Sequence, residues 1–401
     1  MRLDRLVVTG LRNLHGESAE VALQWLPHGR FNLLVGDNGQ GKTNLLEAVA
    51  ILAGLKSFRT AKLQQCIAFG QAQATISGQV LCKGVSSQLG IEIGAKGRKM
   101  LVDGKPVTSA QAFLGQLTAV VFTPGDLGLP HAEPDTRRRW LDRVVFNHQP
   151  AHLDELRRYD QVLHAKNALL KHAQTGKAKA DPAMLDVYDA MLAKHGALVM
   201  QRRAAVVQQF SPLVAEVFDR IAAPGLHADV HYRPKIGGED PEAALLAAQA
   251  QRRLRDLRIG YTTGGPHRDD VDLRVAQVPA HLHASQGQCR ALVLACKIAE
   301  IKSLERAHGE PPVLLMDDVS SELDAKRNAA LMHYLDELGG QVVLTTTSAE
   351  HVRVAATRQV FHVVGGQVRP GLVLSGGPVS VRGSQPTLAF APATKANEDQ
   401  T

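Results

Sequence analysis

The sequence predicts an α/β protein in which a mostly parallel sheet carries an antiparallel β flank and is interrupted by a helical lobe. Three observations support this prediction. Short apolar strands separated by turns fill the first third of the chain. Apolar residues then recur with a period of about 3.6 between residues 135 and 260, which indicates amphipathic helices. After Tyr261 strands alternate with helices, which is typical of parallel sheets whose faces are covered by helices.

The first part of the chain supplies the antiparallel flank and the start of the parallel sheet. Runs rich in Val, Ile, Leu and Phe, bounded by turn residues, predict five strands. One helix opens among them at Gly41. The predicted strands are Leu3 to Thr9, Phe31 to Val35, Ala74 to Leu81, Gln88 to Ile93 and Lys99 to Val102.

The middle of the chain supplies the inserted lobe. Four helices are predicted there, and the third is expected to break near Pro212 because proline cannot donate a backbone hydrogen bond. The predicted helices are Asp135 to Asn147, His152 to Ala173, Asp181 to Ile221 and Pro241 to Ile259.

The last part returns to the head and then ends in a polar tail. Beyond Pro370 the sequence is rich in Gly, Ser, Pro and Thr, and we expect it to be disordered. The domain prediction is a head at 1–134 and 261–370, a helical lobe at 135–260 and a tail at 371–401. The predicted elements of the second head segment are the strands Val271 to Val275, Val313 to Met316 and Gln341 to Thr345, and the helices Gln288 to Ala307 and Lys326 to Glu337.

The composition is that of a globular protein with a basic surface. The chain has 401 residues, of which 44% are hydrophobic, so we expect two or three lobes rather than one simple core. Lys and Arg total 46 against 39 for Asp and Glu, and the net charge of +7 suits a polyanionic partner without identifying one. No signal peptide is evident, and no apolar run approaches the roughly 18 residues of a membrane span. We therefore expect a cytoplasmic protein that does not enter the membrane.

The cysteines are too far apart to suggest a metal site or a redox pair. Cys66, Cys82, Cys289 and Cys296 form no C-x-x-C pair. Cys289 and Cys296 are two turns apart in a helical pattern, which places both on one buried face. We interpret all four as reduced core thiols.

A glycine-rich segment after the second predicted strand fits the pattern G-x-x-x-x-G-K-[ST] of a phosphate-binding loop. Its glycines let backbone N–H groups surround phosphate oxygens at a helix N-terminus, Lys42 reaches the β and γ phosphates, and Thr43 offers a hydroxyl to Mg²⁺. The alternative is a glycine-rich turn that only caps a helix. The predicted ATP-binding residues are Gly36, Asp37, Asn38, Gly39, Gln40, Gly41, Lys42 and Thr43.

A second element of a nucleotide site follows a distant apolar strand. The run from Val313 ends in Asp317 and Asp318. We predict that Asp317 holds Mg²⁺ together with Thr43, and that Asp318 positions the attacking water. The alternative is a buried strand with an acidic end that caps the next turn. The predicted catalytic residues are Lys42, Asp317 and Asp318.

Two further motifs indicate which class of P-loop protein this is. A tetrapeptide, Ser285-Gln286-Gly287-Gln288, starts a long helix, and Ser321-Glu322-Leu323-Asp324 follows the strand carboxylates. Both resemble motifs of ABC-type ATPases, with Ala284 and Gln286 departing from the transporter pattern. That resemblance implies an ABC-type head in which the signature binds the γ-phosphate held by another subunit, and in which Asp324 lies near the nucleotide. Taken alone, Ser285 could be just an N-cap.

Further motifs lie along the chain at Asn44 to Ala48, Ser57 to Thr60, Phe122 to Leu127, Arg137 to Arg139, Thr263 to Asp270, and Asp317 to Asp324. Together they resemble the RecF family over nearly the whole chain to about residue 370. The resemblance implies an ATP-driven homodimer with weak, DNA-dependent ATPase activity. It also implies binding to DNA gaps and single-strand/double-strand junctions, RecR- and RecO-like partners, recombinase loading and a role in the SOS response. Leu11, where Phe is usual, and the tail depart from the family pattern.

Several basic residues are candidates for DNA contact, although a charge run taken by itself is more often a solvated helix face, by about two to one. Aromatic residues make up 4% of the chain, so we expect contacts to phosphates rather than to stacked bases. The segment Gly265 to Asp270 could be structural or could face the nucleotide, and we favour a structural role. The main DNA candidates are Arg59, Arg137, Arg138 and Arg139, followed by Arg12, Lys56, Arg252, Arg253, Arg255 and Arg258.

Three other functions fit the sequence less well. A transporter ATPase subunit would not contain the inserted helical lobe. A GTP-handling or small-molecule enzyme would leave the signature without a role, and the Asn-Lys-x-Asp guanine motif is missing from the sequence. A binding module with a dead site would not be expected to retain Lys42, Thr43, Asp317 and Asp318. Because Asp318 is shorter than the glutamate of transporters, we expect slow hydrolysis.

Overall fold

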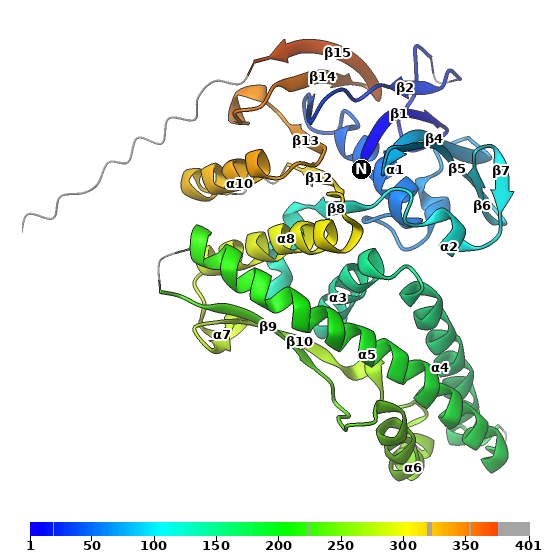
Figure 1. Ribbon diagram of the computed structural model, residues 1–401. Coiled ribbons are helices and arrows are strands. Elements are labelled where there is room, and N and C mark those ends of the chain that lie inside the picture. Colours follow the sequence, from blue (N-terminus) through cyan, green and yellow to red (C-terminus); the bar gives the residue numbers. More distant parts are fainter. Residues whose placement is uncertain (19, 178, 223–224, 319–322, 353, 376–401) are drawn as a thin grey trace, which may run out of the picture.

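The computed structural model has a strand-rich head at one end and a helical lobe at the other (Figure 1). It describes residues 1–18, 20–177, 179–222, 225–318, 323–352 and 354–375. Ser321 and Glu322 of the predicted motif, and the tail from residue 376, lie outside the described residues. No helix in the described part of the chain has the length and apolar character needed to cross a membrane.

A six-stranded sheet forms the centre of the head, in the order β15-β14-β3-β13-β12-β8. All neighbours pair in parallel except the edge strand β15, which is antiparallel to β14. The predicted strands β3, β12 and β13 are confirmed, whereas the sequence did not predict β8, β14 or β15. The strands are β3 (Phe31–Val35), β8 (Ala119–Phe122), β12 (Val313–Asp317), β13 (Val342–Thr346), β14 (Arg358–Val364) and β15 (Gln367–Leu374).

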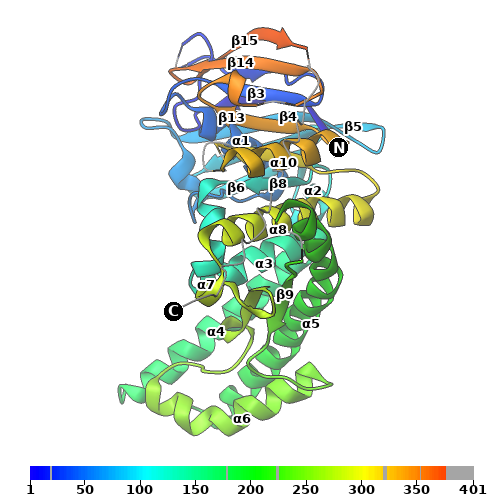
Figure 2. The ribbon, with the colours of Figure 1, turned by 90° about the vertical axis from the view of Figure 1, so that its left-hand side faces the viewer.

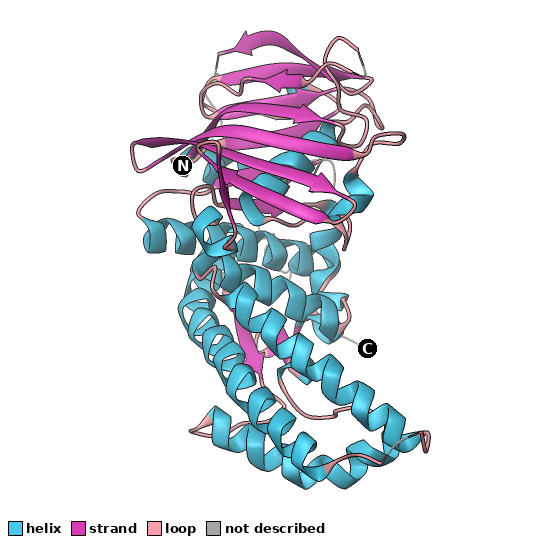
Figure 3. Cartoon of the chain, turned by 90° about the vertical axis from the view of Figure 1, so that its right-hand side faces the viewer, coloured by secondary structure: helices cyan, strands magenta, loops and turns pink. Residues whose placement is uncertain are grey.

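A second six-stranded sheet is antiparallel, in the order β2-β1-β4-β5-β6-β7, and confirms the predicted β flank. Figure 3 shows this strand-rich end above the helices. Its strands are β1 (Arg2–Thr9), β2 (Leu23–Trp25), β4 (Gln73–Cys82), β5 (Val85–Gly94), β6 (Gly97–Val102) and β7 (Lys105–Val107).

The parallel sheet separates two hydrophobic cores. Side chains alternate between the two faces of a strand. Val313 and Leu315 of β12 therefore pack with helix α1 (Lys42–Gly54) and the antiparallel sheet. Leu314 and Met316 pack on the opposite face with helix α8 (Gln286–His308) and the lobe. The helix that follows the phosphate-binding loop and the helix that starts with the predicted signature consequently lie on opposite faces of one sheet.

The lobe contains the four predicted helices, but the predicted break in the third is wrong. Helix α5 runs without interruption through Pro212. The proline costs about 3 kcal/mol, whereas burial of Phe210 and Val214 on either side contributes about 1.5–3 kcal/mol each. Packing therefore outweighs the lost hydrogen bond. The helices are α3 (Pro134–His148), α4 (His152–Gln174), α5 (Pro182–Ile221) and α6 (Pro241–Ile259).

A small antiparallel sheet joins residues on both sides of the expected boundary at residue 260. Strand β9 (Ala228–Arg233) pairs with β10 (Asp270–Val275), and β10 pairs with β11 (Val278–Pro279). The sequence predicted β10 but not β9, so the division at residue 260 cuts through a sheet. Strand β15 likewise continues past residue 370, where the tail was expected to begin.

Short elements complete the described chain, and α10 follows β12 on the side of α8. Cys289 and Cys296 are free and buried on α8, as predicted. The remaining helices are α2 (Ala110–Phe113), α7 (Ala280–His283) and α10 (Ala325–Glu337), with the 3-10 helices η1 (Leu63–Cys66), η2 (Pro124–His131), η3 (Pro266–Arg268) and η4 (Ala349–His351).

Candidate nucleotide-binding site

The glycine-rich loop connects the end of β3 to the start of α1, as the motif requires. Gly39 and Gly41 have φ values of +83° and +110°, which L-residues with side chains rarely adopt. A Cβ on Gly36 would collide with the carbonyl oxygen of Val363, and one on Gly41 would lie 2.9 Å from Oδ1 of Asn13. Glycine is therefore required by the backbone and by its neighbours. The loop ends at the N-terminus of α1, and the N-terminus of a helix favours a bound phosphate.

Lys42 is enclosed by this loop. Its side chain is buried, and Nζ donates hydrogen bonds to the carbonyl oxygens of Gly36 (2.5 Å) and Asp37 (2.9 Å). Burial lowers the pKa of Lys42, while Asp318 and then Asp317 oppose that effect. Among the described residues, the ammonium group has two neutral carbonyl oxygens as hydrogen-bond partners, and a charged phosphate oxygen would be a stronger acceptor.

The two halves of the predicted site meet at Thr43 and Asp317. Oγ1 of Thr43 donates a 2.7 Å hydrogen bond to Oδ1 of Asp317, although the two residues are far apart in sequence. Thr345, at the end of the neighbouring strand β13, donates to the same oxygen (3.0 Å) and accepts the Asp318 N–H (2.9 Å). The sequence analysis did not identify Thr345. A signal for Thr345 was present in the sequence, because the predicted strand Gln341 to Thr345 ends in a polar residue.

Asp318 adopts a left-handed backbone conformation with φ of +50°. For a residue with a side chain this costs about 1 kcal/mol or more, and such residues cluster at functional sites. The hydrogen bond from its N–H to Thr345 helps to hold the turn. The strained turn places Asp318 directly after the carboxylate that contacts Thr43.

The residues at this junction fit a magnesium ion that is shared with a nucleotide. A hydroxyl and a carboxylate are the hard oxygen ligands that Mg²⁺ accepts, and Mg²⁺ usually takes one or two protein ligands together with phosphate oxygens. Throughout the described ranges, no group of three His, Cys, Asp or Glu side chains could hold a metal by itself. Thr43 and Asp317 would therefore hold the ion only in combination with phosphates and water.

The predicted signature lies at the exposed start of α8. Ser285 is the N-cap: its hydroxyl accepts the Gln288 N–H (3.2 Å), and Oε1 of Gln288 accepts the Ser285 N–H (2.8 Å). The interpretation of Ser285 as an N-cap is thus correct. However, the hydroxyl acts here as an acceptor, so its own proton remains available for donation. The structure does not bring this turn to the P-loop of the same chain, because α1 and α8 pack on opposite faces of the sheet.

Arg12 and Arg59 both lie beside the helix that follows the P-loop. Arg12 binds the buried carboxylate of Glu47 through two 2.9 Å hydrogen bonds. Burial would raise the pKa of Glu47, but hydrogen bonds from Arg12 and Ser57 lower it overall. Arg59 donates to Oδ1 of Asn44 (2.6 Å) and is 44% exposed. Arg12 is therefore engaged by Glu47 and partly buried, whereas Arg59 is more accessible to a ligand.

The three consecutive arginines of α3 have different environments. Arg137 binds both carboxylate oxygens of Asp270 (2.8 and 2.7 Å), and Arg138 donates to the carbonyl oxygen of Asp269 (2.7 Å). Arg139 is 71% exposed and pairs with Asp135 on its own helix. Of these three candidates for DNA contact, Arg139 is the most accessible, while Arg137 and Arg138 hold the segment from Gly265 to Asp270.

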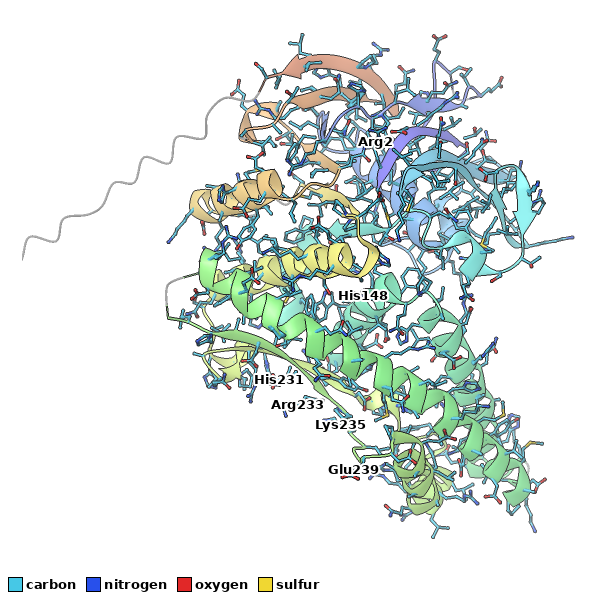
Figure 4. The ribbon with its side chains drawn as sticks, viewed as in Figure 1. Arg2, His148, His231, Arg233, Lys235 and Glu239 are labelled. Atoms are coloured by element: carbon cyan, nitrogen blue, oxygen red, sulfur yellow. The ribbon has the colours of Figure 1, made fainter. Side chains whose placement is uncertain are left out.

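The segment from Gly265 to Asp270 joins the helices of the lobe, in line with the structural role that the sequence favoured. The carbonyl oxygen of Pro266 accepts a hydrogen bond from Arg203 of α5 (2.8 Å), and Nδ1 of His267 lies 2.6 Å from the hydroxyl of Tyr159 on α4. Asp269 accepts hydrogen bonds from Tyr232 and from the Lys235 N–H. Figure 4 shows the labelled residues His231, Arg233 and Lys235 along β9 and the segment after it.

We expect two buried histidines, His148 and His267, to lower the free energy of unfolding in mild acid. Burial lowers the pKa of both His148, beside Ser303 of α8, and His267 to about 4. Below the ordinary histidine pKa of about 6.5 the unfolded chain binds more protons than the folded chain. The free energy of unfolding is therefore unaffected by these two histidines above about pH 6.5, and it decreases as the pH falls from 6.5 towards 4. Urea unfolding at pH 7.5 and pH 5 should show a lower free energy of unfolding at pH 5, and His148→Gln should reduce that difference. An equal free energy at both pH values would contradict the assignment.

Comparison with known proteins agrees with the fold and with the motifs. The family model described as RecF/RecN/SMC N terminal domain matches residues 2–368. The DNA replication and repair protein RecF of Myxococcus xanthus is 43% identical, over 92% of this chain and 97% of that protein. RecF of Geobacter sulfurreducens is 39% identical, over 92% of this chain and 100% of that protein.

Solved structures give the same result. The recombination mediator protein RecF-ATPrS in the RecFOR pathway matches with a TM-score of 0.83 and 26% identity, over 92% of this chain and 98% of that one. An Smc head domain derived from Pyrococcus furiosus matches with a TM-score of 0.52 and 13% identity, over 93% and 96% of the two chains, which shows a shared fold. This chain therefore has the fold of an ABC-type ATPase head with an inserted helical lobe and belongs to the RecF family.

Proposed function

We propose that this chain is an ATP-dependent DNA-binding protein of replication and recombinational gap repair. The observation that carries the proposal is the junction at which Thr43, Asp317 and Thr345 meet beside the buried Lys42. The relatives that match most of the chain are named as DNA replication and repair proteins, and one solved structure is named as RecF-ATP in the RecFOR pathway. The chain would act in the cytoplasm, together with RecR- and RecO-like partners.

In this proposal the site hydrolyses ATP slowly. The loop residues Gly36, Asp37, Asn38, Gly39, Gln40 and Gly41 surround the phosphates, and Lys42 balances their charge. Thr43 and Asp317 hold Mg²⁺, which neutralises charge on the phosphate oxygens when it is bound. Asp318 orients the attacking water. An aspartate reaches less far than a glutamate, so turnover is slow and the protein works as a timed clamp rather than as a pump.

The signature turn serves a second copy of the chain. The packing of α8 and α1 on opposite faces of the sheet supports the proposal that Ser285, Gln286, Gly287 and Gln288 bind a nucleotide held by another molecule rather than their own. Two copies would then enclose two nucleotides, with Asp324 near the shared surface. The resulting homodimer binds DNA gaps and single-strand/double-strand junctions and supports recombinase loading and the SOS response. Arg59 and Arg139 are the most accessible of the four main candidates for contact with DNA phosphates.

Sedimentation velocity tests this proposal directly. With ATP and Mg²⁺ the chain should sediment as a dimer, and with a gapped duplex the dimer should co-sediment with the DNA. Ser285→Arg should prevent the dimer, because a bulky cation would occupy the position of the incoming phosphate, and should leave nucleotide binding by the single chain intact. A wild-type chain that stays monomeric and free of DNA under these conditions would refute the repair function and leave only the fold.

A further inference from the structure

A side chain from another helix contacts Gly287 in the first turn of α8. Arg327 lies in the first turn of α10, and Asp324, the N-cap of α10, accepts the Arg327 N–H (2.9 Å) and a hydrogen bond from its guanidinium. A Cβ on Gly287 would lie 2.6 Å from Nη2 and 3.2 Å from Cζ of Arg327. The guanidinium therefore lies against the backbone of Gly287. Helices α8 and α10 are neighbours in Figures 1 and 2.

This contact explains the glycine at position 287 in physical terms. Gly287 is helical, so its backbone conformation would accept any residue. Alanine would even favour the helix by about 1 kcal/mol. The missing side chain at Gly287 leaves the space that the guanidinium of Arg327 fills, and an alanine there would have to displace this flexible group. Gly287 of α8 and Arg327 of α10 therefore have complementary shapes at this contact.

The positive charge of Arg327 lies close to the N-terminus of α8. The N-terminus of a helix is its positive end, and a cation there is unfavourable. The first turn of α8 contains no acidic residue. Within the described ranges Arg327 forms its ion pair with Asp324, which is itself about half exposed, and its buried Nε has no hydrogen-bond partner. The fold thus places a cation at an electrostatically costly position and ties it to one carboxylate.

We propose that Arg327 is a positioning residue that joins the signature turn to Asp324 and thereby sets how Ser285 is presented to a second copy of the chain. The proposal rests on the proposed function, because the orientation of Ser285 matters only if it meets a nucleotide held by another molecule. Arginine suits this role because its guanidinium carries several N–H donors, so that it can bind Asp324 while it lies close to the Gly287 backbone. A turn that is already oriented loses less conformational freedom when the two copies associate.

The first test compares three variants by sedimentation equilibrium with ATP and Mg²⁺. Arg327→Ala should weaken ATP-dependent dimerisation by about ten- to a hundredfold, the range expected when a charge-assisted hydrogen bond is lost. Arg327→Lys should restore part of it, because lysine keeps the charge but not the planar fork. Lys326→Ala, which removes an exposed cation from the neighbouring position of α10, should leave dimerisation unchanged. Nucleotide binding by the single chain and the melting temperature should not change in any variant.

A double-mutant cycle then separates positioning from direct obstruction. Gly287→Ala should weaken dimerisation because its Cβ displaces the guanidinium. If that is the reason, Gly287→Ala should add little once Arg327 is already alanine. If the new methyl group instead obstructs the incoming phosphate, the two effects should add.

The outcomes distinguish this inference from the proposed function. If the wild-type chain does not dimerise with ATP, the proposed function fails and the role of Arg327 fails with it. If the wild type dimerises but Arg327→Ala dimerises equally well, the proposed function stands and the role of Arg327 is refuted. Additive effects in the cycle would likewise refute positioning through Gly287.

Discussion

Replacing Lys42 with arginine should reduce ATP hydrolysis by about a hundredfold or more, the effect typical of removing one electrostatic contact from an active site. The reason lies in the space around Nζ. The ammonium group is buried, with the carbonyl oxygens of Gly36 and Asp37 as close partners. A guanidinium carries the same charge but is planar and larger, so it cannot take the same position in the loop.

Phosphate release from ATP, measured with and without gapped DNA, checks this expectation. Lys62→Arg is the matched control, because Lys62 is exposed and lies outside the P-loop, so its activity should equal that of the wild type. An unchanged melting temperature for Lys42→Arg would show that the fold is intact. Normal turnover by Lys42→Arg would mean that residues 36–43 do not form the catalytic loop.

Replacing Arg203 with methionine should destabilise the protein by about 3–5 kcal/mol, the cost of leaving a buried charge without its partner. Arg203 is 3% exposed on α5 and donates to both carboxylate oxygens of Asp142 on α3 (2.8 Å each). It also donates to the carbonyl oxygen of Pro266. Burial would raise the pKa of Asp142, but Arg203 and His152 hold it at about 2. Without Arg203 the carboxylate of Asp142 loses the cation that offsets most of its desolvation cost.

Urea unfolding at pH 7 measures this effect against a total stability of about 5–15 kcal/mol for a typical protein. Methionine keeps most of the apolar stem of arginine, so the loss would reflect charge rather than volume. Arg139→Met removes an exposed arginine and should change stability by less than about 0.5 kcal/mol. The double variant Asp142→Leu/Arg203→Met should recover part of the loss, because the carboxylate of Asp142 is removed together with its partner, while Asp269, 3.8 Å from Arg203, keeps hydrogen bonds from Tyr232 and the Lys235 N–H. If Arg203→Met is as stable as the control, the network from Asp142 to Pro266 does not hold the lobe together.

Local patterns in the sequence were sufficient for most elements of the head and the lobe. The glycine loop, the apolar strand that ends at Asp317 and the four lobe helices all follow from residue types within one short segment, and the structure contains each of them. Strand β9 also alternates apolar and polar residues, but it is short and lies between long helices, so its pattern was not recognised. The continuity of α5 through Pro212 could not be predicted, because it depends on the core that its neighbours share.

At the candidate site, some contacts could be predicted from short sequence segments and others could not. The sequence by itself was enough to predict that Lys42, Thr43, Asp317 and Asp318 belong to a nucleotide site, because each lies in a segment whose pattern indicates its chemistry. The tertiary structure decided that Thr345 supports Asp317 and that Arg137 and Arg138 are engaged by the segment after Gly265. It also decided that Arg327 lies on Gly287. These contacts join residues far apart in the chain, and they form because the strands of a parallel sheet end at a common edge and helices pack on its two faces, which no local pattern encodes.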